Sequence, residues 1–184
     1  MKEPSAVSTA TIAIRPYRIE DASALHEAAI ESAAEVQPFM PWCHAALTVQ
    51  QARTWIEIQI RAFESCDAFE FAVVGADSRF LGSCGVNQID LIRHRGNLAY
   101  WVRTSATGRG VATAAIQQVV GWIFQNTELG KLEAVISTDN VASIRAAEKA
   151  GGIREGILRG RLWLHGTAHD AAIFSFVKSG EKTT

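Results

Sequence analysis

Apolar residues recur along this chain with two spacings, and these spacings divide it into strands and helices. Short runs rich in β-branched and aromatic residues, bounded by turn residues, predict strands. Apolar positions three and four residues apart predict helices. The expected strands cover residues 12–15, 69–74, 80–88, 98–102, 131–136, 153–164 and 171–177. The expected helices cover residues 20–36, 49–64, 111–125 and 142–150.

The order of these elements indicates an α/β protein of the α+β type. One strand is followed by two helices, three strands, a helix, a strand, a helix and two final strands. This order fits a mixed sheet with helices on both faces. No repeat, linker or low-complexity tract divides the chain, so residues 11–184 are expected to form one domain. Residues 1–10 are small and polar and are expected to form a loose tail.

The most informative segment joins the expected strand 98–102 to the helix 111–125. It ends in Gly108-Arg109-Gly110, and the helical pattern begins at the next residue. A helix end opened by glycines presents unpaired backbone N–H groups and the positive end of the helix dipole. Both features bind phosphate groups well. An ordinary strand-to-helix turn with two glycines is the plainer alternative.

Two familiar phosphate-binding loops do not fit this segment. A nucleotide P-loop needs Lys and then Ser or Thr after its last glycine, whereas Val111 and Ala112 follow here. A dinucleotide-binding fingerprint needs Gly or Ala at the position of Thr113, in an early βαβ unit, but this loop lies past the middle of the chain.

A second segment, residues 138–156, follows about one strand later. Asp139 or Asn140 is suited to cap a helix, residues 142–150 favour helix, and Gly151 is suited to end it. Together the two segments resemble the GNAT superfamily of acetyl-CoA-dependent N-acetyltransferases. The stretch from Asn140 through Ser143 to Glu155-Gly156 resembles its ribosomal-protein N-terminal acetyltransferase (RimJ/RimL-like) branch. Weaker similarity lies in Met40-Pro41-Trp42, Leu158-Arg159, Gly166, Asp170 and 173–177.

This resemblance implies the GNAT fold, with a mixed, mostly antiparallel central sheet of about seven strands and helices on both faces. It implies acetyl-CoA as co-substrate and no metal. Backbone groups of the strand and the glycine loop would hold the cofactor, with Asn140 and Ser143 on the following helix. The implied cofactor-binding residues are Trp101, Val102, Arg103, Gly108, Arg109, Gly110, Val111, Ala112, Thr113, Asn140 and Ser143.

Ser143 is the catalytic candidate, because the family places a hydroxyl near the sulfur of the cofactor. It would donate a hydrogen bond to the departing thiolate, a fair leaving group since a thiol has a pKa near 8.5. Asn140 would contact the cofactor arm, cap its helix, or do both. Tyr100 and Trp101 alternate along their strand, so one is expected to face the core and the other the acceptor.

No general base stands out in the sequence. Residues 97–99 and 161–163, where some relatives place a glutamate, carry no carboxylate. Glu70, Asp90, His165 and Asp170 stay open, each more typical of a surface or hairpin position. The absence of a strong base either favours an α-amine acceptor, whose pKa is near 8, over lysine, whose pKa is near 10.4, or means that the activity is weak.

The composition of the chain limits the classes of partner that it could bind. The net charge of −1 gives no basic field for nucleic acid, and no apolar run reaches the length of a membrane span. His165 and His169 are spaced like helical metal ligands, but Gly166 separates them in a predicted hairpin. This composition fits a cytoplasmic protein, and the branch resemblance implies a protein N-terminus as the acceptor. Relatives often pair, so the resemblance also implies a homodimer, which would cover exposed strand edges. The alternatives are a small-amine acetyltransferase and a non-catalytic acyl-CoA-binding module.

Overall fold

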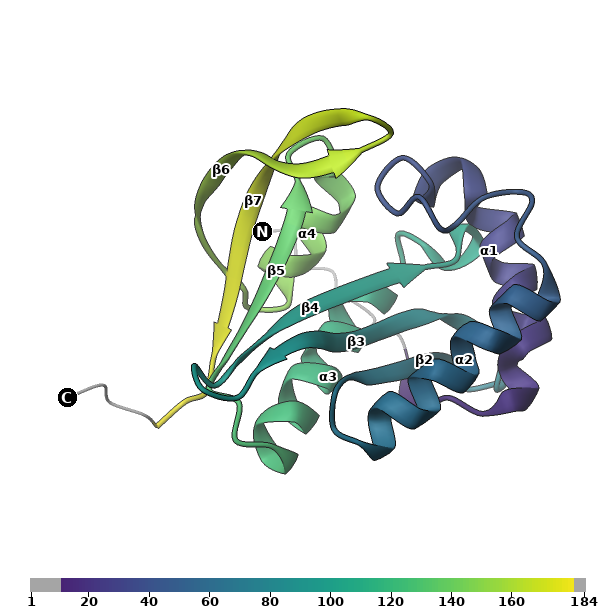
Figure 1. Ribbon diagram of the computed structural model, residues 1–184, viewed down its shortest axis with the longest axis horizontal. Helices are drawn as coiled ribbons and strands as arrows, with labels where there is room; N and C mark the ends of the chain where they lie inside the picture. Colours follow the sequence, from purple (N-terminus) through teal and green to yellow (C-terminus); the bar gives the residue numbers. More distant parts are fainter. Residues whose placement is uncertain (1–10, 181–184) are drawn as a thin grey trace, which may run out of the picture.

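The computed structural model describes residues 11–180, which form one seven-stranded sheet with helices on both faces (Figure 1). The strands are β1 (Ile12–Pro16), β2 (Phe69–Gly75), β3 (Phe80–Asp90), β4 (Arg95–Val102), β5 (Lys131–Ser137), β6 (Ile153–Leu164) and β7 (Thr167–Val177). The helices are α1 (Ala22–Val36), α2 (Val49–Glu64), α3 (Val111–Asn126) and α4 (Val141–Lys149), with short 3-10 turns η1 (Ile19–Asp21) and η2 (Thr104–Ala106).

Two neighbouring strands of the sheet, β4 and β5, pair over only part of their length. Its order is β1-β2-β3-β4-β5-β7-β6, and all neighbours are antiparallel except β4 and β5, which are parallel. These two strands pair only between Arg95–Asn97 and Lys131–Glu133. Beyond those pairs they diverge, as Figure 1 shows, and we call their unpaired stretches, residues 98–102 and 134–137, the splay.

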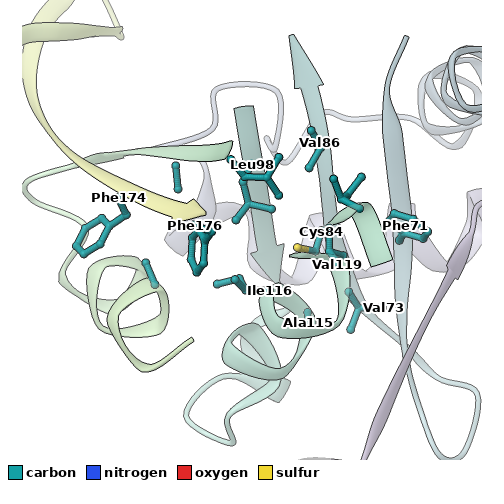
Figure 2. Packing of buried hydrophobic residues seen from close by; sticks show 14 of the residues in the cluster. Phe71, Val73, Cys84, Val86, Leu98, Ala115, Ile116, Val119, Phe174 and Phe176 are labelled. Atoms are coloured by element: carbon teal, nitrogen blue, oxygen red, sulfur yellow. The ribbon is translucent and has the colours of Figure 1, made fainter. Parts of the chain in front are cut away.

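The two faces of the sheet have separate apolar clusters. One packs α3 and α4 against side chains such as Phe71, Val86 and Phe174 (Figure 2). The other packs α1 and α2 against Ala72, Phe80 and Trp101. Alternate residues of one strand enter different clusters, because successive side chains of a strand point to opposite faces.

The predicted fold class is confirmed, and the differences are at element boundaries. The last strand begins at Thr167 rather than at residue 171, and β4 begins at Arg95 rather than Leu98. The helix expected from residue 20 begins as a 3-10 turn, in which the Asp21 carboxylate pairs with Arg15. The predicted tail, residues 1–10, lies outside the described residues.

Gly152, which follows α4, lies against an aromatic side chain of β7. A Cβ at Gly152 would lie 2.8 Å from Cζ of Phe176. Phe176 is itself buried in the cluster under α4. The aromatic ring that packs under this helix therefore comes from the last strand. None of the helices within residues 11–180 is both long and apolar enough to cross a membrane.

Candidate active site

The glycine loop leaves the N-terminus of α3 open. Gly110 is the N-cap residue, with φ of 79°, and Gly108 has φ of 74°, in the left-handed region that favours glycine. A Cβ built on either residue would meet nothing within 4 Å. No hydrogen bond from the described residues engages the backbone N–H groups between Gly108 and Thr113. This arrangement suits a diphosphate, because free N–H groups converge at the positive end of a helix dipole.

Helix α1 fixes the segment that leads into this loop. The guanidinium of Arg103, buried to 3% exposure, pairs with Glu27 and Glu31, and its Nη1 donates to the carbonyl of Phe80. Glu31 also accepts a hydrogen bond from the backbone N–H of Ser105, at 2.8 Å. The Arg103 guanidinium holds the pKa of Glu31 at about 2.

Arg103 therefore has a structural role that the sequence did not indicate. Its side chain is taken up by α1, and its backbone N–H donates to the carbonyl of Leu81. Any contact of Arg103 with a cofactor would have to use its carbonyl group. Glutamates 27, 31 and 35 at four-residue spacing were the available signal, since that spacing places them on one face of a helix.

The two aromatic residues of β4 face opposite sides of the sheet. Trp101 lies on the α1–α2 side, where its ring packs edge-on against Trp42 with centroids 5.5 Å apart. Tyr100 lies on the α3–α4 side and is partly buried there. The predicted alternation is confirmed; the contact of either ring with an acceptor stays a prediction.

Two hydrogen bonds join Tyr100, in the β4 stretch of the splay, to Ser143 on α4. The Ser143 hydroxyl donates to the Tyr100 oxygen at 2.8 Å, and the Tyr100 hydroxyl donates to the Ser143 carbonyl at 2.9 Å. Burial raises the pKa of Tyr100 well above its usual value, so this phenol stays protonated. Asn140 caps α4, because its side-chain oxygen accepts from the Ser143 N–H at 3.1 Å. The sequence missed this Tyr100 pairing, which joins residues far apart in the chain.

The remaining predicted cofactor residues lie around these two features. Val102 is partly exposed at the end of β4, and Arg109 is exposed beside the glycines. Val111 is buried at the start of α3, where Ala112 and Thr113 are partly buried, so backbone groups are what this helix end offers. Their role as a cofactor site stays a prediction. Within residues 11–180 no cluster of three or more His, Cys, Asp or Glu side chains could hold a metal ion.

Three of the four residues left open as bases have contacts of their own with other parts of the fold. Asp90 pairs with Arg93, which lowers the pKa of its carboxyl. Asp170 accepts from the backbone N–H of Gly160 at 2.8 Å. Nε2 of His165, in the β6–β7 turn, lies 2.9 Å from the carbonyl oxygen of Gln37 after α1.

Glu70 departs from the expectation of a surface position. It is 8% exposed and lies on the inner, α1–α2 face of the sheet. The sequence did not predict this burial, because a carboxylate within an apolar strand ordinarily faces water.

Comparisons with known proteins agree with this geometry. Residues 11–153 match the acetyltransferase (GNAT) domain family. YdaF of Bacillus subtilis (strain 168), whose name assigns it provisionally to the ribosomal N-acetyltransferases, is 26% identical over 93% of this chain and 95% of its own.

Two solved structures share the fold at 20% identity. One is the ribosomal L7/L12 α-N-protein acetyltransferase RimL in complex with coenzyme A, with a TM-score of 0.86 over 95% of this chain and 98% of that one. The other is the microcin C7 self-immunity acetyltransferase MccE with acetyl-CoA and AMP, with a TM-score of 0.85 over 91% and 93%. The chain thus belongs to the GNAT acetyltransferase domain family, as an N-acetyltransferase that takes its acetyl group from acetyl-CoA.

Proposed function

We propose that this enzyme acetylates the α-amine of a protein N-terminus, of the ribosomal-protein type. The observation that carries the proposal is the splay beside an open α3 N-terminus, which would hold the diphosphate and leave the thioester along β4. The names of YdaF and RimL support the acceptor class.

Two segments flank the splay on the side where we expect the acceptor peptide to bind. One is the connection between α1 and α2, where Trp42 is 42% exposed and packs on Trp101. The other is the β6–β7 turn, held against the end of α1 through His165 and Gln37 (Figure 1). On this proposal, the peptide N-terminus enters between these two segments.

The chemistry needs little acid or base strength from the protein. The amine nitrogen forms a bond to the acetyl carbon, the carbon–sulfur bond breaks, and the sulfur leaves with the electron pair. At pH 7 roughly a tenth of an α-amine is neutral, against well under a thousandth of a lysine side chain. An α-amine therefore needs only a weak or water-relayed base.

A panel of acceptors tests this function. Peptides with a free N-terminus should release thiol from acetyl-CoA, whereas the same peptides with a blocked N-terminus and an internal lysine should not. Polyamines and amino acids serve as the small-amine arm, and mass spectrometry would locate the acetyl group. Thiol release with small amines but not with peptides would indicate a small-amine acetyltransferase. Coenzyme A binding without any acceptor-dependent release would favour a binding module.

Ser143→Ala should lower kcat about tenfold and change coenzyme A affinity less than twofold, because one hydrogen bond contributes about 0.5–1.5 kcal/mol. The affected bond would be the one from the Ser143 hydroxyl to the departing sulfur, for which this hydroxyl would turn away from the Tyr100 oxygen to which it donates in the structure. Steady-state kinetics and calorimetric titration measure the two quantities. Ser179→Ala, at an exposed position near the C-terminus, is the control. An unchanged kcat would remove this role from Ser143.

The expected homodimer and cytoplasmic location stay predictions. Strand β6 is the edge of the sheet and exposes Ile153, Ile157 and Trp163. An exposed apolar edge strand is where a second chain would add.

A further inference from the structure

A polar cluster is buried between the sheet and helices α1 and α2. Glu70 is 8% exposed, Ser83 4% and Tyr17 5%. The Ser83 hydroxyl lies 3.3 Å from Oε2 of Glu70 and 3.3 Å from the carbonyl oxygen of Phe71, so it can donate to either. The Tyr17 hydroxyl is buried and has no hydrogen-bond partner among residues 11–180. An unpartnered buried hydroxyl next to a carboxyl group is unusual, because buried polar groups are normally paired.

The Glu70 carboxylate is directed across β3 toward the splay. In the sheet, Glu70 is opposite Gly85, and Gly85 is opposite Ala99 of β4. Residues directly opposite in antiparallel strands point to the same face. A Cβ at Gly85 would overlap the Glu70 carboxylate, so this carboxylate lies over the Gly85 backbone. Only glycine at this position allows the side chain to lean over β3.

Glu70, Gly85 and Ala99 form a row across β2, β3 and β4, and this row ends at the splay. Asn97 is the last residue of β4 that pairs with β5, so Ala99 lies within the splay. Ala99 carries only a methyl group, and Gly85, between it and Glu70, carries no side chain. Asn97, bonded to Asn87 at 2.8 Å, borders the row on one side and Trp101 borders it on the other. Gly85 and Ala99 are therefore the residues that stand between the Glu70 carboxylate and the splay along these pairings.

The surroundings of Glu70 bring the pKa of its carboxyl close to neutral pH. Burial raises its pKa to about 7, against hydrogen bonds from Ser83 and Asn87 that lower it. The other titratable groups that interact with it are the phenol of Tyr17 and, on the opposite face, the thiol of Cys84; burial raises the pKa of both, so both stay neutral. A base is most effective when its pKa is close to the working pH.

We propose that Glu70 accepts the proton lost by the acceptor amine, through a water molecule held by Tyr17 and Ser83. The proposal rests on the amine acetylation described above. As the carbon–nitrogen bond forms and the thiolate leaves, the amine nitrogen gives one proton to the water. The water passes one of its own protons to the Glu70 carboxylate. Glu70 is thus a proton acceptor that acts at a distance from the amine.

Glu70→Gln tests this role, because the amide keeps the size of the side chain and still accepts from Ser83. With a peptide acceptor at pH 7, kcat should fall about 100-fold, the usual scale for a general base, while the KM for acetyl-CoA stays within twofold. The wild-type kcat should rise with pH around a midpoint near 7. The kcat of Glu70→Gln should not show this rise. Glu64→Gln, at the exposed end of α2, should retain both the rate and the pH profile.

Urea unfolding separates this role from a folding defect and has a readout of its own. A carboxyl with a pKa of 4.5 unfolded and about 7 folded stabilises the fold most below pH 4.5, and that stabilisation is lost as pH rises through 7. The wild-type midpoint, compared with that of Glu70→Gln, should fall across this range. A folded Glu70→Gln with the wild-type kcat and pH profile would overturn the role of Glu70 and leave the transferase function standing. If the wild type releases no thiol with any amine, both the role of Glu70 and the transferase function are overturned.

Discussion

Replacing Gly110 by alanine is expected to raise the Kd for coenzyme A by about 100-fold, measured by calorimetric titration. Gly110 is the N-cap of α3, and its missing Cβ leaves the loop surface open. An alanine methyl would occupy the space through which the diphosphate approaches the free N–H groups. Losing one or two charge-assisted hydrogen bonds, at about 1.5–3 kcal/mol each, gives an effect of this size.

A matched glycine distinguishes lost contacts from backbone strain. Gly151 also has positive φ, 99°, and a Cβ there would meet nothing within 4 Å, but it ends α4 and lies outside the loop. Both alanine variants carry a left-handed strain of about 1–2 kcal/mol, so both should lose similar thermal stability. Only Gly110→Ala should lose coenzyme A. If Gly151→Ala weakened binding equally, the loop would not be the diphosphate site.

The sequence was informative wherever the chemistry is local. The glycine loop is contiguous, and its left-handed residues are the ones that glycine permits, so its conformation could be predicted from six neighbouring residues. The cap at Asn140 depends on a residue three positions away and was equally readable. The capping of α2 by Thr48, whose side chain accepts from the N–H of Gln51, is a contact of the same local kind. In each case the partners lie within one helical turn.

Contacts between distant segments could not be predicted in this way. Arg103 and Glu31 are 72 residues apart, and Tyr100 and Ser143 are 43 apart. The burial of Glu70 depends on the register of β2 with β3, which places a glycine opposite the carboxylate. A one-residue shift of that register would move Glu70 away from Gly85. Charge and periodicity in the sequence do not specify such a register.

Arg103→Met should lower the free energy of unfolding by about 3 kcal/mol, because removing one partner of a buried pair typically costs about 3–5 kcal/mol. The lower end is expected since Glu27 is 69% exposed and Glu31 28%, so both carboxylates regain water. The same change removes the ion pairs that hold the start of η2 to α1 and leaves the hydrogen bond from the Ser105 N–H to Glu31, so coenzyme A binding should weaken but not be lost. Urea unfolding and calorimetric titration measure the two effects.

The pH dependence identifies the ion pair as the source of this loss. The Arg103 guanidinium lowers the pKa of Glu31 from 4.5 to about 2, so the pair stabilises the fold above pH 4.5 and this contribution is lost as pH falls toward 2. The gap between wild type and Arg103→Met should therefore be constant from pH 5 to 8 and shrink in acid. Glu27→Gln, at a mostly exposed partner, should lose less than about 1 kcal/mol. A gap that persists unchanged at pH 2 would instead indicate that Arg103 stabilises the fold through packing and its bond to the Phe80 carbonyl.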